Sequence, residues 1–255
     1  FMEMEVSQTF STAGVRETVL PAYMGMIKQI DDHLGNLFGW LEESGKADET
    51  MIVVTSDHGD YLGDHWLGEK ELFHEVSVRV PLIIYDPRPD ANKTRGKVVS
   101  ELVEAIDLVP TFLAATGAPS ADHRLEGLSL EPLIHGEFVE NWRSAVFSEI
   151  DYSYYKARDI LGVGNYDARG YMVRTNDWKY IYFRGFEPQL FNLNDDPNEF
   201  QDLGRDVDYE ETRRNMHAIL LDRLTGRKNR VALSDEALEN ARGKETSDGI
   251  LIGKW

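Results

Sequence analysis

A short apolar run that opens into polar and glycine residues constrains the fold of this chain more than any other feature. Residues 51–54 read Met-Ile-Val-Val and are followed by the sequence TSDHGD. A short β-branched run bounded by turn residues is typical of a strand buried on both faces, as in a parallel sheet. A second run, PLIIY at residues 81–85, has the same character. The two runs predict central strands of an α/β fold.

Helical patterns flank these strands. Between Pro21 and Glu43, apolar residues recur at spacings of three and four, which predicts a helix with one buried face. Pro21 suits the first turn of this helix, and Gly45 suits the position just beyond its end. A shorter helix is expected at residues 108–116, with Asp107 as its N-terminal cap.

The pattern changes after about residue 140. Short runs of aromatic and β-branched residues predict strands, and WKYIYFR at residues 178–184 alternates as a strand with one buried face does. We therefore expect a main α/β domain at 1–140, a small antiparallel sheet with a closing helix at 141–225, and a polar arm at 226–255. The expected strands are 146–150, 170–174, 178–184 and 189–193, with a weaker candidate at 98–104, and the closing helix is 206–224.

Charge and cysteine content exclude several classes of partner. The net charge of −18 disfavours nucleic acid and anionic membrane surfaces, because both attract clustered Lys and Arg. The chain has no cysteine, which excludes disulfides and thiolate metal sites and is typical of a cytoplasmic protein. No apolar run reaches the roughly 20 residues that span a bilayer. We therefore expect a cytoplasmic protein with neither a nucleic-acid nor a membrane partner.

Side chains that can carry chemistry gather directly after the first predicted strand. Asp57 and His58 follow it, and ligands of open α/β sheets bind beyond the carboxyl ends of the strands. A carboxylate beside an imidazole can bind a divalent cation, and Lys70 can meet an anionic oxygen of a substrate. His65 and His74 are further candidate ligands. The same pattern also fits a helix cap with a hydrogen-bonded histidine, so the residues alone leave both interpretations open.

Longer segments carry a resemblance to a known family. SDHGDYLGDHWLGEKELFHEVSVRVPLIIYDP resembles the C-terminal signature of sulfatases and their relatives in the alkaline phosphatase superfamily. DLVPTFLAATG, LEGLSLEPLIHG and WKYIYFRGFEPQLFNLNDDPNEFQDL follow in the family's order, so that the resemblance covers residues 16–224. PAYMGMIKQIDDHLG together with GDYLGDHWLGEKELFHE is most similar to bacterial phosphonate monoester hydrolases, with arylsulfatases as the near alternative.

The resemblance implies a fold, a reaction and a site. The fold is the C-terminal part of a three-layer αβα alkaline-phosphatase-like sandwich, with a small appended antiparallel sheet and a C-terminal helix. The reaction is hydrolysis of phosphonate monoesters, phosphodiesters or sulfate esters with one divalent cation, namely Mn, Ca or Mg, with Zn or Fe as further candidates. Asp57 and His58 match metal ligands, and Lys70 matches the lysine that contacts the transferring group. Asp60 and Asp64 are expected to support the loop.

The chain departs from the family in one respect. The family's nucleophile is a formylglycine made within a Cys/Ser-x-Pro/Ala-x-Arg motif, which has no convincing match here, and the chain opens FMEMEV. We therefore expect a C-terminal half that turns over little substrate alone. Its expected partners are the N-terminal half of the same protein, a small anionic ester, and further copies in a dimer or tetramer. A non-catalytic metal-binding or assembly module and a metal-dependent phosphomutase remain alternatives, the latter requiring a Ser or Thr nucleophile.

Overall fold

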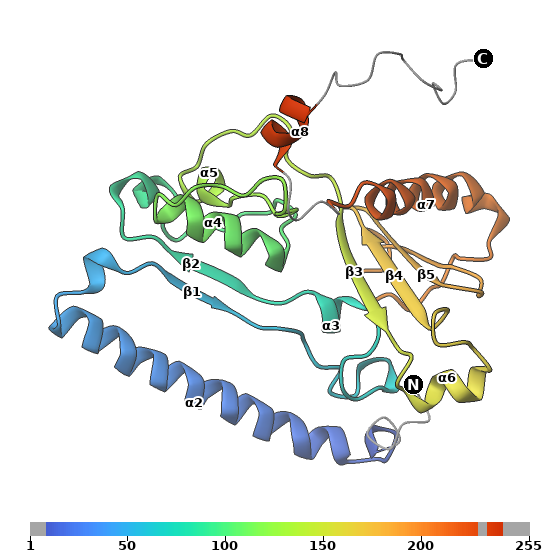
Figure 1. Cartoon of the computed structure of the whole chain (residues 1–255). Coiled ribbons are helices and arrows are strands. Elements are labelled where there is room, and N and C mark those ends of the chain that lie inside the picture. Colours follow the sequence, from blue (N-terminus) through green and yellow to red (C-terminus); the bar gives the residue numbers. More distant parts are fainter. Residues whose placement is uncertain (1–8, 229–233, 242–255) are drawn as a thin grey trace. The chain divides into compact units, whose positions relative to one another are not determined.

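The computed structural model, drawn in Figure 1, describes residues 9–228 and 234–241 of the chain. They belong to two compact units, one formed by residues 1–103 with 132–222 and the other by residues 104–131 with 223–255. These units do not follow the boundaries expected at residues 140 and 225, and the three-part division stays a prediction. Most of the expected polar arm lies outside the described residues, which end at helix α8 (Asp235–Ala241).

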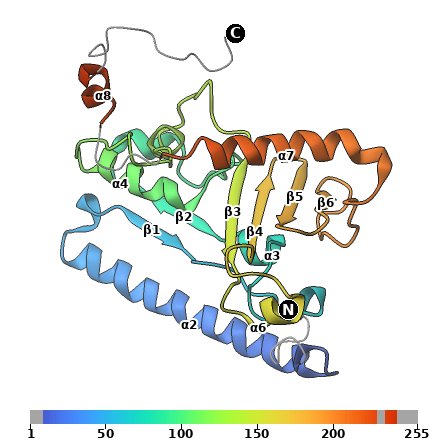
Figure 2. The same ribbon diagram turned by 45° about the vertical axis from the view of Figure 1, so that its right-hand side comes forward.

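A long helix, α2 (Val15–Glu43), opens the first unit and runs beside β1 in Figures 1 and 2. It begins after Gly14, whose φ of 83° is readily adopted by glycine, so Pro21 lies inside the helix rather than in its first turn as expected. The predicted apolar face is present, but much of it is exposed, since Ile27 and Ile30 are 46% and 58% exposed, whereas Leu41 at its end is buried. Periodicity identified the face of this helix, and the described residues cover only part of it.

Two short strands follow, and they pair differently from the prediction. β1 (Ile52–Thr55) and β2 (Leu82–Tyr85) are antiparallel, with Ile52 opposite Tyr85 and Thr55 opposite Leu82. The expectation of parallel-type, doubly buried strands is wrong for this pair. The connection at residues 56–81 contains only short helical turns and reverses the chain direction, whereas a parallel pair needs a crossover that returns to the same end of the sheet.

The second sheet confirms the expected antiparallel arrangement. Its four strands follow each other in chain order, β3-β4-β5-β6, and each pairs with the next. The observed bounds lie within one or two residues of those expected, because alternating patterns define strands well. The strands are β3 (Val146–Asp151), β4 (Arg169–Arg174), β5 (Trp178–Phe183) and β6 (Gln189–Asn192).

This sheet is covered on both faces. On one face lies α7 (Glu210–Thr225), where the Tyr180 hydroxyl is 3.1 Å from Nδ1 of His217 (Figure 2). On the other face, Phe73 from the β1–β2 connection packs with Met172, Ile181 and Phe191 in a buried cluster. The β1–β2 connection therefore rests on the second sheet, although the two sheets share no strand.

The β1–β2 connection is held in an unusual backbone conformation. Leu62, His65, Trp66 and Glu69 have positive φ values between 46° and 61°. Each such residue costs roughly 1–3 kcal/mol and persists only where its surroundings hold it. The connection also contains the turn η2 (Asp64–Trp66) and the short helix α3 (Glu75–Val78).

A buried tyrosine–histidine pair holds this connection together. The Tyr61 hydroxyl lies 2.7 Å from Nδ1 of His74, and both residues are buried. Burial lowers the pKa of His74 to about 3, and the charges of His65 and Lys179 act in the same direction. Burial also raises the pKa of Tyr61 above its usual value. The tyrosine therefore donates its proton to a neutral histidine.

The second unit contains α4 (Leu108–Ala115), which confirms the expected helix, and the turn η4 (Ala105–Asp107) before it. Asp107 is the N-cap residue of α4, as predicted, but its side chain makes no capping bond to that helix. Its carboxylate accepts the N–H groups of Glu104 and Leu128, both over 2.8 Å, and does not cap α4. The two bonds satisfy the buried carboxylate at the preceding turn and at the segment around Leu128 instead.

The remaining elements are short, and residues 98–104, a weak strand candidate, form no strand. None of the helices in the described part of the chain has the length and apolar character needed to cross a bilayer. The short elements are η1 (Ala47–Glu49), η3 (Pro89–Lys93), α5 (Glu131–Ile134), α6 (Lys156–Leu161) and η5 (Val207–Tyr209).

The Tyr61–His74 pair predicts a pH dependence of stability. Folded His74 stays neutral down to about pH 3, whereas in the unfolded chain it binds a proton near pH 6.5. The unfolded state therefore binds more protons in this window. The free energy of unfolding should fall as the pH falls from 6.5 towards 3, by up to about 1.4 kcal/mol per pH unit from this residue. Urea unfolding at several pH values measures the slope, and His74→Gln should reduce it.

A matched control is His217→Gln, which also removes a histidine ring next to a tyrosine hydroxyl, that of Tyr180, but at an exposed position. Equal slopes in the wild type and in His74→Gln would contradict a buried neutral His74.

Candidate metal and anion site

Asp57 and His58 lie just beyond the end of β1, as the sequence predicted. Nε2 of His58 is 3.4 Å from Oδ2 of Asp57, and the two side chains are 40% and 84% exposed. The backbone N–H of His58 donates to Oδ1 of Asp57 over 3.0 Å, and this bond lowers the pKa of the Asp57 carboxyl. An ionised carboxylate and an imidazole nitrogen therefore face the same accessible region.

The His58 ring is held in one tautomer. Its Nδ1 lies 2.7 Å from the carbonyl oxygen of Gly59, which can only accept a hydrogen bond. Nδ1 therefore carries a proton, and in the neutral ring the lone pair is on Nε2, beside Asp57. The Ser56 hydroxyl donates to the His58 carbonyl over 2.7 Å and steadies the same turn. Metal-binding histidines typically have this arrangement, with one nitrogen bonded to a backbone carbonyl and the other free for the ion.

These two side chains supply only part of a coordination shell. Among residues 9–228 and 234–241, no group of three or more His, Cys, Asp or Glu residues is arranged to hold a metal ion. The nearby carboxylates act within the loop, because Asp60 accepts the N–H of Leu62 over 2.9 Å and Asp64 pairs with Arg16 over 2.7 Å. This agrees with the supporting role expected for Asp60 and Asp64. The donor set fits half of a divalent-cation site.

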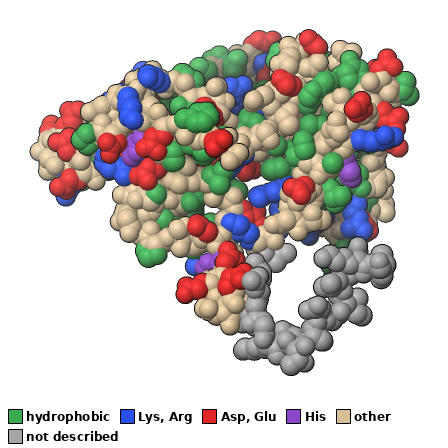
Figure 3. All heavy atoms as spheres, turned by 90° about the horizontal axis from the view of Figure 1, so that it is seen from above, with side chains coloured by type: hydrophobic (Ala, Val, Ile, Leu, Met, Phe, Trp, Pro, Cys, Tyr) green, Lys and Arg blue, Asp and Glu red, His purple; other side chains and the backbone are tan. Residues whose placement is uncertain are grey.

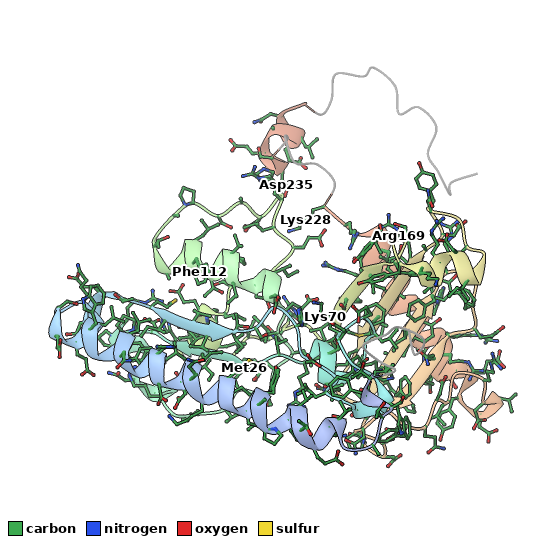
Figure 4. The ribbon with its side chains drawn as sticks, turned by 90° about the horizontal axis from the view of Figure 1, so that it is seen from below. Met26, Lys70, Phe112, Arg169, Lys228 and Asp235 are labelled. Atoms are coloured by element: carbon green, nitrogen blue, oxygen red, sulfur yellow. The ribbon has the colours of Figure 1, made fainter. Side chains whose placement is uncertain are left out.

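Lys70 is exposed in the segment that leads to α3, and it is labelled in Figure 4. Within the described part of the chain, its ammonium group has no hydrogen-bond or ion-pair partner. Its backbone, by contrast, is fixed, because the buried Ser77 hydroxyl donates to the Lys70 carbonyl over 2.6 Å. A cation on a fixed backbone with an unpaired head group suits the recognition of an anion.

Ser77 joins the two parts of the site. Its carbonyl oxygen accepts the N–H of Gly59 over 2.7 Å, while its hydroxyl donates to Lys70. The approach is so close that a Cβ atom at Gly59 would lie 1.9 Å from the carbonyl oxygen of Val76. Gly59 is therefore required here, and the segment carrying Asp57 and His58 is tied to the segment carrying Lys70.

The other candidate ligands form a stack instead of a metal site. The His65 ring stacks on His74, with centroids 4.0 Å apart, and on Phe200, with centroids 4.7 Å apart. His74 is buried and bonded to Tyr61, so its ring is committed to the loop. The other histidine–partner contacts lie elsewhere in the fold, such as that of His135 with Asp86 over 3.1 Å.

Sequence reasoning missed the residues that support the site. Ser77, Glu75 and Tyr61 are ordinary residues of the loop sequence, and nothing in their spacing indicates their contacts. Lys179 did leave a signal. It occupies the same alternating positions in β5 as Ile181 and Phe183, which places a lysine on the buried face of a strand.

Comparison with known proteins identifies the family. A family model described as "N-sulphoglucosamine sulphohydrolase, C-terminal" matches residues 63–225, and a "Sulfatase" model matches residues 4–118. An arylsulfatase of Clostridium perfringens is 36% identical over 208 residues, covering 81% of this chain and 40% of that protein. The multifunctional alkaline phosphatase superfamily protein PehA of Trinickia caryophylli is 34% identical over 190 residues, covering 73% and 36%.

Comparison with solved structures indicates the same family. The crystal structure of the phosphonate monoester hydrolase of Agrobacterium radiobacter matches with a TM-score of 0.75 and 33% identity, covering 80% of this chain and 40% of that one. The chain thus spans less than half the length of these relatives. The expected fold class, part of an alkaline-phosphatase-like α/β fold with a small antiparallel sheet, is confirmed. This chain belongs to the sulfatase and phosphonate monoester hydrolase family of the alkaline phosphatase superfamily.

Proposed function

We propose that this chain is the C-terminal half of a divalent-cation-dependent hydrolase of small anionic esters, with phosphonate monoesters and phosphodiesters as its substrates. The observation that carries the proposal is the fixed His58 tautomer, which directs Nε2 towards the region that the Asp57 carboxylate also faces. The unpaired ammonium of Lys70, tied to the same turn through Ser77, adds the group that an anionic substrate needs. The names of the relatives support ester hydrolysis as the reaction class.

Each residue has a distinct role in this proposal. Asp57 stays ionised at neutral pH because the bond from His58 N–H lowers its pKa, so it is ready to bind a cation. His58 keeps its Nδ1 bonded to the Gly59 carbonyl, which leaves Nε2 as the nitrogen that can bind the cation. When bound, the cation supplies Lewis-acid stabilisation of negative charge and lowers the pKa of a hydroxyl nucleophile. Lys70 places a positive charge against an anionic oxygen of the transferring group, where charge must be balanced in the transition state.

We propose that the part of the protein that this chain does not span supplies the rest of the site. A formylglycine nucleophile and further metal ligands would come from that N-terminal half. The exposed apolar residues of the first unit offer a surface for it: Ile30 of α2 and Ile83 of β2 are 58% and 63% exposed, and Met26 (Figure 4) is 55% exposed. Burying such side chains stabilises each by roughly 1.5–3 kcal/mol. Without that half, little turnover is expected.

Arylsulfatase activity is the second candidate, because the Clostridium perfringens relative of that name is 36% identical. Sulfate and phosphonate esters share tetrahedral anionic geometry, so the same cation and lysine can serve both.

Manganese, calcium and magnesium all suit an oxygen-rich site, and we propose one of them as the cation. A dimer or tetramer and a cytoplasmic location stay predictions. The face in Figure 3 carries both acidic and basic side chains.

The ligand roles predict a selective loss of metal affinity. In the complete protein that contains this chain, Asp57→Asn should weaken Mn²⁺ binding by more than about 100-fold, which is the upper end of what losing an outer-shell group costs. Titration calorimetry measures the affinity. Asp64→Asn is the matched control, because Asp64 belongs to the same loop but pairs with Arg16, and it should bind Mn²⁺ as the wild type does. Equal losses in both variants would refute the ligand role of Asp57.

Lys70 should affect turnover and not metal binding. Lys70→Gln should lower kcat/KM for a phenyl phosphonate ester by about 10²–10³-fold, as losing one stabilising group in a transition state does, and should leave the Mn²⁺ affinity unchanged. Steady-state kinetics with phosphonate and sulfate esters in parallel also rank the two substrate classes. Lys46→Gln, in the turn after α2, is the control that should keep full activity. A fully active Lys70→Gln enzyme would contradict this role.

A further inference from the structure

The short helix α3 lies between the candidate site and the second sheet. Phe73, two residues before α3, is 3% exposed and packs on Met172, Ile181 and Phe191 of that sheet. Val78 of α3 lies at the edge of the same cluster. Figure 2 shows α3 beside strands β3 to β5 on the side away from α7. Apolar contacts of this kind hold the helix against the sheet, but they set its register only loosely because they have no direction.

Lys179 of β5 supplies the directional contacts. Its side chain has no exposed surface. Its ammonium group donates to the Phe73 carbonyl over 2.8 Å and pairs with Glu75 over 2.9 Å and Glu199 over 2.6 Å. An ammonium group has three N–H donors, and here three oxygen atoms lie within 2.9 Å of it. The lysine thus fixes both the entry to α3 and its first residue.

Glu199 completes this contact set from the segment that follows β6. Its second carboxylate oxygen accepts the backbone N–H of Glu75 over 2.6 Å, at the start of α3. Glu199 has a φ of 57°, a conformation that a non-glycine residue keeps only when its surroundings hold it. Glu75 also pairs with Arg174 of β4 over 3.3 Å. Residues of β4, of β5 and of the segment after β6 therefore all contact the first residue of α3.

The charges within the cluster influence each other strongly. Burial raises the pKa of Glu199, and the attraction of Lys179 offsets this only in part. Burial also acts to raise the pKa of Glu75, but Lys179, Arg174 and Arg79 outweigh it, so that this pKa lies below its usual value. Replacing a buried ion cluster by apolar residues of similar volume is often neutral or stabilising. The cluster is therefore poorly explained as a source of stability, and the precise placement of α3 explains it better.

The position of α3 directly affects the position of the candidate site residues. Ser77, two residues after Glu75, bonds Gly59 through its carbonyl and Lys70 through its hydroxyl. A shift of α3 along the sheet would move both contacts. The close approach of Gly59 to Val76 leaves no space to absorb such a shift.

We propose that Lys179, with Glu199, is a positioning residue of the hydrolase: it sets α3 on the sheet and thereby the separation of Lys70 from Asp57 and His58. The inference rests on the proposed function for its effect on turnover. It is separate from that function in its effect on the order of residues 57–78. Lys179 touches neither substrate nor cation in this scheme.

The test compares the double variant Lys179→Met/Glu199→Leu with the wild type in the complete protein. The double variant leaves Glu75 paired with Arg174, so no buried charge loses all its partners. We expect kcat to fall about 10- to 100-fold, as when a supporting group behind a site is lost, with a smaller change in KM. Hydrogen exchange of the peptide 57–78 should accelerate by at least about tenfold, while that of β5 and β6 stays as in the wild type.

Tyr180→Phe is the matched control. Tyr180 is the neighbour of Lys179 in β5 and is also buried, and the variant removes its contact with His217 on the opposite face of the sheet. It should leave kcat and the exchange of residues 57–78 unchanged. A folded double variant with wild-type exchange in this peptide would overturn the inference. If the double variant does not fold, the isosteric Glu199→Gln is measured in the same way, with the same outcomes for and against.

The two proposals fail separately. A wild-type protein that hydrolyses neither phosphonate nor sulfate esters would refute the proposed function, and the exchange of residues 57–78 would then decide the positioning role alone. An active wild type whose variants exchange and turn over like the control would refute the positioning role and leave the function standing.

Discussion

The arrangement of the first unit depends on a lysine ammonium group buried between a sheet and a four-residue helix. Removing this charge from water is expensive, and the structure compensates with two carboxylates and a carbonyl oxygen that all come from outside β5. These partners bring the β1–β2 connection and the segment after β6 together on one face of the second sheet. The apolar cluster around Phe73 stabilises this packing, and the ion cluster fixes the position of α3 on the sheet. The strained loop at residues 61–69 can persist because both of its ends are fixed.

The half-site follows from this arrangement. Asp57 and His58 extend from β1, and Lys70 extends from the loop, so neither strand pairing nor apolar packing relates them to each other. Ser77 on α3 does so through two hydrogen bonds. The second sheet thus acts as a support for the site, although it contributes no group that we expect to touch the substrate. The chain spans less than half the length of its relatives. It contains one side of the proposed site together with the sheet that supports that side.

The sequence predicted the second sheet well, because alternation in WKYIYFR and its neighbours defines both the strands and their faces. It failed for β1 and β2, since a short apolar run carries no information about the direction of its partner. Asp57, His58 and Lys70 were found from their order after a strand and from the family resemblance, but the His58 tautomer needed the Gly59 carbonyl in three dimensions. Leu62, Trp66 and Glu69 rarely adopt positive φ, so no residue pattern could reveal that loop conformation. The buried position of Lys179 was readable from alternation, whereas its partners lie more than one hundred residues before it or follow the next strand.

The most direct test is a crystal structure of the complete protein with Mn²⁺ and a phosphonate anion. Our account predicts a single ion bonded at about 2.0–2.6 Å by the Asp57 carboxylate and by Nε2 of His58, with Nδ1 still bonded to the Gly59 carbonyl and the Lys70 ammonium facing the anion. An ion bound through Nδ1 of His58, or bound at residues other than Asp57 and His58, would contradict it.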